Sequence, residues 1–496
     1  MTRIAIFADA HFPDRPDTVK DTVFEWVVHE TARRQVDYLV GAGDLTSIGT
    51  AAAARRLRQK AGALPLLLTP GNADLRSPAE TAACLEILQT SQMQDNIVLL
   101  DTSAIRLSPA SRALLAELPP QGNRIAVTHC PHHYLPSEDQ QLLAECLADQ
   151  TITTLVSGHI HRDEDNGPYQ VTCGIDPDKA LGGPPAIIIM DNASGSWQRE
   201  DIACDFADPR TWAIAERTEW LGFLGISGMK DTLAALAAAA EHCVPSFEIR
   251  AAESLALPAT ALAAAMDAWR RRGGRHLSIH LPTIGLNADG AVSVPVNMSA
   301  SLEMARQVRA HAVTIHPPAA PVAALRSDSS LYASMLDAFA HTLAPLVKDG
   351  IVIGIENMHL RRDEPADEQR FFGYTPQECR EWIAALRQRL GNEAVGFLLD
   401  IGHARNNHSL ASRYNVSEWY AELGAWLTGC HLHQFTVLDG KAQGHCPLKK
   451  LFGHAISLSS FFIAWQQGQL ARVPMYLEIR TEPAIESYLA LRDILS

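Results

Sequence analysis

Seven side chains that can bind metal ions follow five short apolar segments in the first third of the sequence. They are Asp9, His11, Asp44, Asn72, His129, His159 and His161. Carboxylates and neutral imidazoles are the ligands that a dinuclear metal centre needs, together with one residue that can bind both ions. Turn chemistry explains a single Asp or Asn after a strand, but not two histidines spaced by one residue, as in SGHIH. The sequence therefore predicts a metal site.

The segments FADAHF, GAGDL, TPGNAD, VTHC and SGHIH, in this order, resemble the motifs of the calcineurin-like metallophosphoesterases. The resemblance covers roughly residues 1–200. It implies a phosphoesterase with two divalent ions, for which mixed oxygen and nitrogen ligands suit Mn, Fe, Zn or Ni. It also implies that Asp44 bridges an ion held by Asp9, His11 and His161 and an ion held by Asn72, His129 and His159.

One residue departs from this family pattern. The usual Gly-Asn-His segment carries a histidine that protonates the leaving oxygen, whereas this chain has Ala73. Loss of a general acid costs about 10²–10⁴ in rate. Either His132 or His133 replaces it as the proton donor, or the natural leaving group needs no donor. The second alternative favours diesters and activated phosphates over alkyl monoesters.

Beyond residue 220, eight short β-like strings alternate with helical stretches over about 275 residues, which is the pattern of a TIM barrel. They are FLGISGM, SFEIRA, HLSIHLP, AVTIHPP, IVIGIENM, VGFLLDIGH, GCHLHQF and PMYLEIRT. Most of these strings end in His, Asp or Glu, at the strand ends where barrel enzymes place their active sites. The sequence thus predicts a second, separate site at the mouth of a barrel.

Four of these polar residues come from four different strands, so that a single divalent ion could draw them together. They are Glu356, Asp400, His431 and Glu478. Their segments resemble the shared metal site of the xylose-isomerase-like barrels, a superfamily of sugar isomerases, epimerases and the endonuclease IV group. We expect His433, two residues after His431, to share its face of the strand and to support or replace it.

Four further histidines match ligands of the endonuclease IV branch, which implies one to three ions (Zn, Mn or Mg) in the barrel. They are His280, His316, His403 and His445. That branch has Asp where this chain has Gln443, and a neutral amide is a poor ligand, so the third ion of that branch is in doubt. The alternative for each histidine is simple hydrogen bonding within the strand.

The chain is predicted to be α/β throughout, with ligands at the carboxyl ends of strands. The resemblances imply a metallophosphoesterase αββα sandwich over residues 1–204 and a (β/α)8 barrel over residues 221–496. The intervening residues 205–220 mix Asp, Pro and charged side chains and are predicted as the linker.

Composition restricts the partners and the location. The net charge of −14 argues mildly against a large nucleic-acid footprint, and no apolar run approaches the roughly 20 residues of a membrane span. Nine scattered cysteines without a CxxC pair indicate neither a disulfide framework nor a zinc knuckle. We expect a cytoplasmic protein that acts on a small phosphorylated substrate; an oligomer is compatible with the sequence.

Three functions fit these patterns. The favoured one is a bifunctional enzyme, in which a phosphoesterase is fused to an isomerase-like or epimerase-like barrel acting on a sugar or sugar phosphate. The second is a nucleic-acid-processing enzyme with an endonuclease-like barrel, which the histidine set favours and the acidic charge disfavours. The third is a binding role for one degenerate domain, which the departures at Ala73 and Gln443 would explain.

Overall fold

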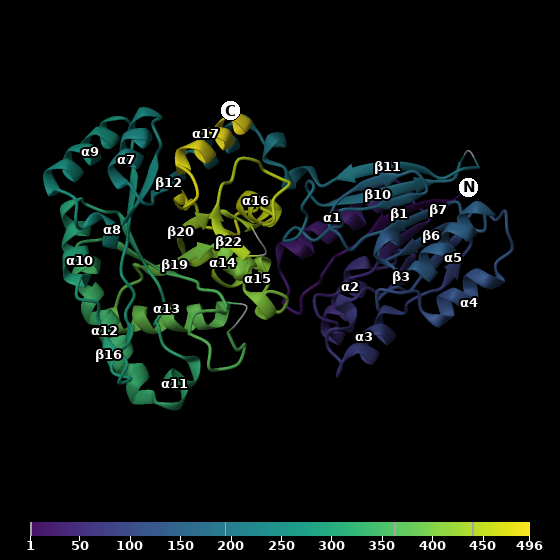
Figure 1. The fold of residues 1–496 in the computed structure, drawn as a ribbon, viewed down its shortest axis with the longest axis horizontal. Helices are drawn as coiled ribbons and strands as arrows, with labels where there is room; N and C mark the ends of the chain where they lie inside the picture. The colour runs from purple at the N-terminus through teal and green to yellow at the C-terminus, as the bar shows by residue number, and fades with distance from the viewer. Residues whose placement is uncertain (1, 194, 362–363, 439–440) are drawn as a thin grey trace. The chain divides into compact units, whose positions relative to one another are not determined.

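The computed structural model describes residues 2–193, 195–361, 364–438 and 441–496. These residues form two compact units (Figure 1). The first unit comprises Met1–Asp208 and Phe452–Ile463, and the second comprises Pro209–Leu451 and Ala464–Ser496. No helix within the described ranges is long and apolar enough to cross a membrane.

The first unit contains two sheets. One has the order β11-β10-β1-β2-β3, with β1 (Arg3–Phe7), β2 (Tyr38–Ala42), β3 (Leu66–Thr69), β10 (Ala186–Asp191) and β11 (Gln198–Ala203). The other has the order β4-β5-β6-β7-β9-β8, with β4 (Met93–Gln94), β5 (Ile97–Leu100), β6 (Ile125–Thr128), β7 (Thr154–Ser157), β8 (Glu164–Asn166) and β9 (Tyr169–Val171). Strands β1, β2 and β3 are parallel, as are β5, β6 and β7.

The two sheets pack face to face, with helices on their outer sides. Ile6 and Val40 of the first sheet share a buried core with Val127 and Val156 of the second. The other face of the second sheet packs against helices, because its alternate residues join Leu143 of α5 in a second core. The helices are α1 (Val19–Arg33), α2 (Ala51–Ala61), α3 (Thr81–Leu88), α4 (Pro109–Glu117) and α5 (Ser137–Ala148), with short η1 (Ala73–Leu75), η2 (His132–Tyr134) and η3 (Asp205–Ala207).

The second unit is built around a closed barrel of eight parallel strands, which confirms the predicted TIM barrel. Seven of the strands lie within their predicted strings, and β20 begins two residues before its string GCHLHQF. They are β12 (Leu224–Gly228), β13 (Ser246–Arg250), β14 (His276–His280), β17 (Ala312–Ile315), β18 (Val352–Glu356), β19 (Val395–Asp400), β20 (Leu427–Leu432) and β23 (Met475–Leu477). Two small hairpins accompany them: β15 (Gly285–Leu286) with β16 (Val292–Ser293), and β21 (Gln434–Leu438) with β22 (Lys441–Cys446).

Helices surround these strands and bury their apolar faces, as Phe339 of α12 does by packing edge-on against Trp382 of α13 at 5.1 Å. The helices are η4 (Pro209–Thr211), α6 (Ile214–Leu221), α7 (Thr232–Glu241), α8 (Ala251–Ser254), α9 (Ala259–Arg271), α10 (Met298–Gln307), α11 (Val322–Ser327), α12 (Ser329–Lys348), α13 (Pro376–Leu390), α14 (Ile401–Arg405), η5 (His408–Leu410), α15 (Val416–Leu423), η6 (Gly424–Trp426) and α17 (Ala484–Leu495). A further helix, α16 (Ser459–Gln466), begins in the first unit and ends in the second.

The chain crosses between the units more than once. One crossing, between Asp208 and Pro209, falls inside the predicted linker. Residues 452–463, which the sequence placed with the barrel, lie in the first unit. There the Ser457 hydroxyl donates a hydrogen bond of 2.9 Å to the carbonyl of Pro177, and the Gly453 amide donates one of 2.6 Å to Leu181. A segment distant in sequence thereby braces the loop that follows β9.

Candidate metal centres

The predicted ligands of the first unit sit on loops that leave the carboxyl ends of β1, β2, β3, β6 and β7. Five of these seven residues have a left-handed backbone conformation, which residues other than glycine rarely adopt. They are Asp9 (φ 52°), His11 (φ 41°), Asp44 (φ 49°), His159 (φ 75°) and His161 (φ 55°). Such strain costs on the order of 1–3 kcal/mol per residue and clusters at functional sites. The strain therefore supports a functional role for these loops.

Asp44 lies between two groups of potential ligands. Its Oδ2 lies 3.5 Å from His11 Nε2, while its Oδ1 lies 3.3 Å from His129 Nε2. Asp9 joins both sides, because it groups with His11 and His161 on one side and with Asp44 and His129 on the other. Two ions bridged by Asp44 would match this arrangement, as the family resemblance implies.

Asn72, His129 and His159 bring their potential ligand atoms together in the second group. The ring Nδ1 of His129 lies 3.1 Å from the carbonyl of Ala42, which favours a proton on Nδ1 and leaves Nε2 an acceptor. That acceptor lies 3.0 Å from the side-chain amide of Asn72 and 3.0 Å from His159 Nδ1. An amide oxygen and two imidazole nitrogens this close together are a ligand set that fits a metal ion.

The first group is also unsatisfied without an ion. Asp9 Oδ1 and both ring nitrogens of His11 are buried and have no hydrogen-bond partner among the described residues. Burial and the neighbouring Asp44 raise the pKa of Asp9 well above its usual range, and burial lowers the pKa of His11. Buried polar atoms rarely stay unpaired in a native protein, so this group also fits a metal ion.

Asp74 fixes the two loops that carry Asp44 and Asn72. It is fully buried, and its carboxylate accepts hydrogen bonds from the amides of Leu45, Thr46 and Gly71 at 3.1, 2.8 and 2.9 Å. A side chain at Gly71 would collide with Asp44, because a Cβ there would lie 2.1 Å from the Asp44 amide nitrogen. The carboxylate and the glycine together hold the two loops close enough to share one site.

The two histidines predicted as proton donors lie away from the ligand atoms. His132 packs on Tyr169, with ring centroids 4.4 Å apart, and its Nε2 lies 3.3 Å from the carbonyl of Gln140. His133 packs against Tyr134, with ring centroids 4.8 Å apart. Within the described ranges, the hydrogen bond and ring contacts of these two histidines are to residues other than the predicted ligands. Their role as donors stays a prediction.

Two residues beside the site were missed by the sequence reasoning. The Nη2 of Arg76 lies 3.2 Å from the side-chain amide of Asn72. Burial is the main cause of the lowered pKa values of His11 and His159, and the Arg76 guanidinium is a smaller contribution in the same direction. Tyr134 lies edge-on to His159, with ring centroids 5.6 Å apart. Arg76 follows Ala73 by three residues in the motif, so a cation close to the departure was the available signal.

Cys130 groups geometrically with His129 and His159, but it is not a good ligand. Burial raises the pKa of its thiol to about 12, and its Sγ donates to the carbonyl of Thr102 at 3.5 Å. A protonated, hydrogen-bonded thiol packs rather than ligates.

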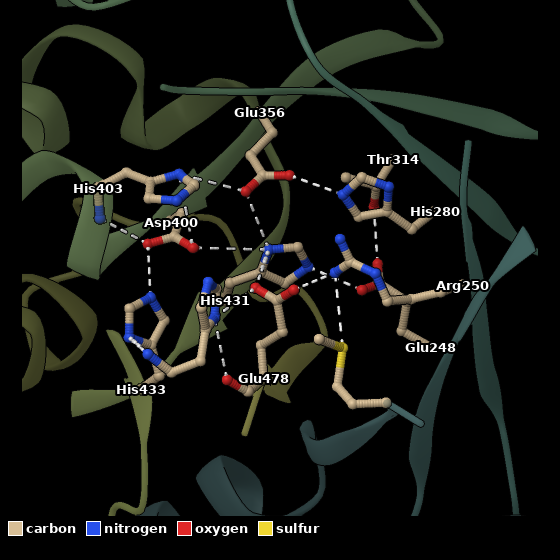
Figure 2. Close-up of polar contacts among 12 residues, drawn as sticks. Glu248, Arg250, His280, Thr314, Glu356, Asp400, His403, His431, His433 and Glu478 are labelled. Carbon is tan, nitrogen blue, oxygen red and sulfur yellow. Dashed lines mark hydrogen bonds and ion pairs between the residues drawn. The ribbon is translucent and has the colours of Figure 1, made fainter. Parts of the chain in front are cut away.

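In the barrel, the four predicted ligands converge at the carboxyl ends of β18, β19, β20 and β23 (Figure 2). The Nδ1 of His431 lies 3.3 Å from Glu356 Oε1, 3.4 Å from Glu478 Oε2 and 3.9 Å from Asp400 Oδ2. The last two oxygens are buried and have no hydrogen-bond partner among the described residues. Three carboxylates around one imidazole nitrogen form a fitting site for a divalent ion.

Glu356 faces a second group with its other oxygen. Its Oε2 lies 3.1 Å from His280 Nε2 and 3.4 Å from His316 Nε2. These three residues form a potential metal-binding group of their own, which shares only Glu356 with the first. In Figure 2 the carboxylate of Glu356 stands between His403 on one side and His280 on the other. A carboxylate in this position could bind two ions, one in each group.

The remaining histidines support Asp400 and Glu478 rather than forming a third group. His433 Nε2 lies 3.1 Å from Asp400 Oδ1, His403 Nδ1 lies 3.4 Å from Glu356 Oε1, and His445 Nδ1 lies 3.3 Å from Glu478 Oε2. Around Gln443, the described residues contain no third group of three potential ligands. His433 therefore supports the site through Asp400 instead of replacing His431.

Glu248 and Arg250 of β13 belong to this site and were missed. Glu248 is fully buried; its Oε1 lies 2.9 Å from His431 Nε2, and its Oε2 accepts a hydrogen bond of 2.8 Å from the Thr314 hydroxyl. Arg250 pairs with Glu478 Oε1 and leaves Oε2 turned towards His431. A Glu inside the apolar strand string SFEIRA was the signal that could have identified Glu248.

These contacts set the protonation of the metal-free site. Burial lowers the pKa of His431, but Glu248, Glu356 and Glu478 outweigh burial and hold that pKa well above its usual value. Burial raises the pKa values of Glu356 and Glu478, and His431 and its neighbours outweigh it and hold both well below their usual range. Without metal, the three glutamates thus favour the protonated form of His431.

Comparison with known proteins agrees with both sets of motifs. A family model described as a xylose isomerase-like TIM barrel matches residues 236–490, and one described as a calcineurin-like phosphoesterase matches residues 2–163. Both resemblances are thereby confirmed. No curated protein matches the chain.

Several solved structures are similar to the chain. They include a D-tagatose 3-epimerase-like protein (19% identity over 55% of this chain and 96% of that chain, TM-score 0.36). Another is a D-psicose 3-epimerase from Clostridium cellulolyticum H10 (12% identity, 55% and 93%, TM-score 0.35). A third is a family 2 AP endonuclease from Brucella melitensis (12% identity, 54% and 96%, TM-score 0.38).

Proposed function

We propose that the chain, which belongs to the xylose isomerase-like TIM barrel family and carries a calcineurin-like phosphoesterase domain, is a bifunctional metal-dependent enzyme with two phosphoester-cleaving sites. Its first domain hydrolyses diesters and activated phosphates. Its barrel acts on a small phosphorylated substrate at a pair of divalent ions. Bound at these sites, divalent ions supply Lewis-acid chemistry that neutralises charge on the oxygens of a phosphoester.

In the first domain, the residues provide a bridge, a set of neutral ligands and one additional cation. Asp44 faces both ligand groups, so its charge would hold the two ions together. Arg76, exposed beside Asn72, is placed to bind a non-bridging phosphate oxygen. A guanidinium stabilises charge but cannot give up its proton at neutral pH.

An alanine at the position of the family's histidine favours good leaving groups. Ala73 is fully buried and offers no proton, and its amide donates to Asp44 Oδ1 at 2.6 Å. The preference for diesters and activated phosphates follows because neither Ala73 nor Arg76 can supply a proton to the leaving oxygen.

In the barrel, the bridging position of Glu356 carries the proposal. Each of its two oxygens faces a different group of potential ligands, and two ions a few ångströms apart suit in-line displacement at phosphorus. Glu248 would hold His431 with Nδ1 towards the ion, because it binds the opposite nitrogen. A one-ion isomerase or epimerase would need only the group of Glu356, Asp400, His431 and Glu478, and it is the second candidate because that group is complete by itself.

The count of ions in the barrel tests the proposal. Asp44→Asn should remove the ions of the first domain and its activity on bis-p-nitrophenyl phosphate, because it weakens the ligand shared by both ions. In that variant, metal analysis should find two ions per chain, both in the barrel. Glu356→Gln should remove barrel ions and leave the diesterase activity intact.

One ion per Asp44→Asn chain would support the isomerase instead. A loss of diesterase activity in Glu356→Gln without unfolding would show that the two sites are not separate and would sink the bifunctional proposal. Preference for an alkyl monoester over the activated diester would contradict the proposed leaving-group selectivity.

A further inference from the structure

A cavity of about 670 Å³ opens beside the barrel metal centre. His403, His433 and His445, which contact the carboxylates of the centre, form its wall on that side. The rest of the wall comes from the segments after β18 and after β19 and from the β21–β22 hairpin. The volume is that of a pocket for a small molecule, and a ligand in it would lie next to the ions.

Two arginines, Arg361 and Arg405, line this cavity together with His359 and His408. Among the described residues, its lining includes no Asp or Glu. The carboxylates of the metal centre lie on the far side of the histidine wall, and Glu364 Oε1 lies 4.0 Å from Arg361 Nε at the edge of the cavity. The cavity and the metal centre therefore differ in charge: arginines line the cavity, and carboxylates form the centre beside it.

Arg405 lacks a partner that other barrel arginines have. Its Nε is buried without a hydrogen-bond partner, and it makes no ion pair with an acid in the described ranges. By contrast, Arg250 pairs with Glu478, and Arg370 pairs with Glu378 at 2.6 Å. A buried donor without an acceptor is costly, so Arg405 is suited to an acceptor that a ligand brings.

Buried hydrogen bonds hold the two walls of the cavity in place. Asn407, which is fully buried, accepts a bond of 2.8 Å from the Leu360 amide and donates one of 2.6 Å to the carbonyl of Tyr374. Asn407 thus ties the segment that carries His359 and Arg361 to the segment that carries Arg405. The backbone segments that carry the cationic side chains are thus held in place before a ligand binds, which reduces the entropy cost of binding.

We propose that this cavity binds a phosphate group of the substrate, held by Arg405 and Arg361, that is distinct from the group reacting at the ions. The inference rests on the proposed function of the barrel and names its substrate class: a small molecule that carries a phosphate in addition to the reacting ester. A guanidinium matches phosphate geometry with two parallel hydrogen bonds. A histidine wall between the two sites sets the distance between the two groups of the substrate.

The test measures binding of inorganic phosphate to the metal-loaded protein by calorimetry, in an Asp44→Asn background that removes the ions of the first domain. Arg405→Met should weaken phosphate binding about tenfold or more, because a hydrogen bond to a charged group is lost. Arg405→Lys should restore part of the binding. Arg271→Met, at an exposed position on α9, is the matched control and should leave binding unchanged.

A second variant separates the pocket from the ions. Glu356→Gln should lower the metal content of the barrel yet preserve the Arg405-dependent phosphate binding. Phosphate binding that disappears in Glu356→Gln and survives in Arg405→Met would place the anion on the ions and overturn the inference. Metal content, measured on the same samples, tests only the proposed function of the barrel. A failure of that function is therefore distinguishable from a failure of the phosphate-pocket inference.

Discussion

Replacement of Glu248 by Gln should weaken metal binding in the barrel without unfolding it. The Gln side chain has the same shape, so its oxygen can still accept from His431 and its amide can donate to Thr314, which lie 2.9 and 2.8 Å from the Glu248 oxygens. Only the negative charge behind the imidazole is lost. Partners of metal-binding histidines contribute about 10–100-fold to metal affinity, so a loss of that size is expected.

Glu248→Ala should lower metal affinity and stability more than Glu248→Gln does. It leaves His431 and Thr314 each with a buried polar group that has lost its partner, at a cost of about 1–3 kcal/mol per group in the free energy of unfolding. The ratio of the metal affinities of the two variants thus separates the effect of the charge from the effect of the lost hydrogen bonds. Affinity is measured by competition with a chromophoric chelator in the Asp44→Asn background, and stability is measured by urea denaturation.

Glu378→Gln is the matched control. Glu378 is equally buried but binds Arg370 and the Gly373 amide, away from the metal centre. It should lower stability and leave metal affinity unchanged. Unchanged metal affinity in Glu248→Gln, or an equal loss in both variants, would refute the view that Glu248 positions His431 for an ion.

Three further predictions concern other parts of the chain. Arg76→Met should lower kcat/KM for the diester by about 10–100-fold, since a charged hydrogen bond contributes about 1.5–3 kcal/mol, and an unchanged value would remove Arg76 from the site. Gly402→Ala should lower the free energy of unfolding by about 1–3 kcal/mol, because a Cβ would lie 2.1 Å from His433 Cε1; a urea midpoint equal to that of the unsubstituted protein would contradict the packing. In the metal-free protein, the stability from the raised pKa of His431 should be lost as pH rises through that pKa, and the stability from the lowered pKa of Glu356 should be lost as pH falls through that one. Thermal unfolding with chelator present should show both declines, and a flat profile would argue against the pairing.

The sequence was sufficient for the elements and for most of the residues at both sites. Strand strings such as IVIGIENM and VGFLLDIGH are short, apolar and bounded by turns, and each contains a strand that ends at a polar residue, Glu356 or Asp400. Parallel strands end at one edge, so residues at those ends must approach one another once the sheet forms. Periodicity and position in the strand thus carry the prediction without knowledge of distant contacts.

Other features depend on contacts that no local pattern records. The sequence does not show that Glu248 faces His431, since the two are 183 positions apart and meet only across the closed barrel. Nor does it show that residues 452–463 lie with the first unit. The left-handed backbone at Asp9 and His11 is likewise a result of tertiary packing, because neither residue prefers that conformation by itself strongly enough to impose it.

The sequence by itself determined the two α/β architectures and the choice of candidate ligand side chains, because these depend on hydrophobic periodicity and on residue chemistry. Only the tertiary structure decided which oxygen of Glu356 faces which histidines, and that Arg405 lines a cavity and has no acidic partner among the described residues. Both features depend on the orientation of a side chain and on the residues around it, which are set when strands and loops far apart in the chain pack together. The number of ions and the charge of the substrate are proposed from those directions.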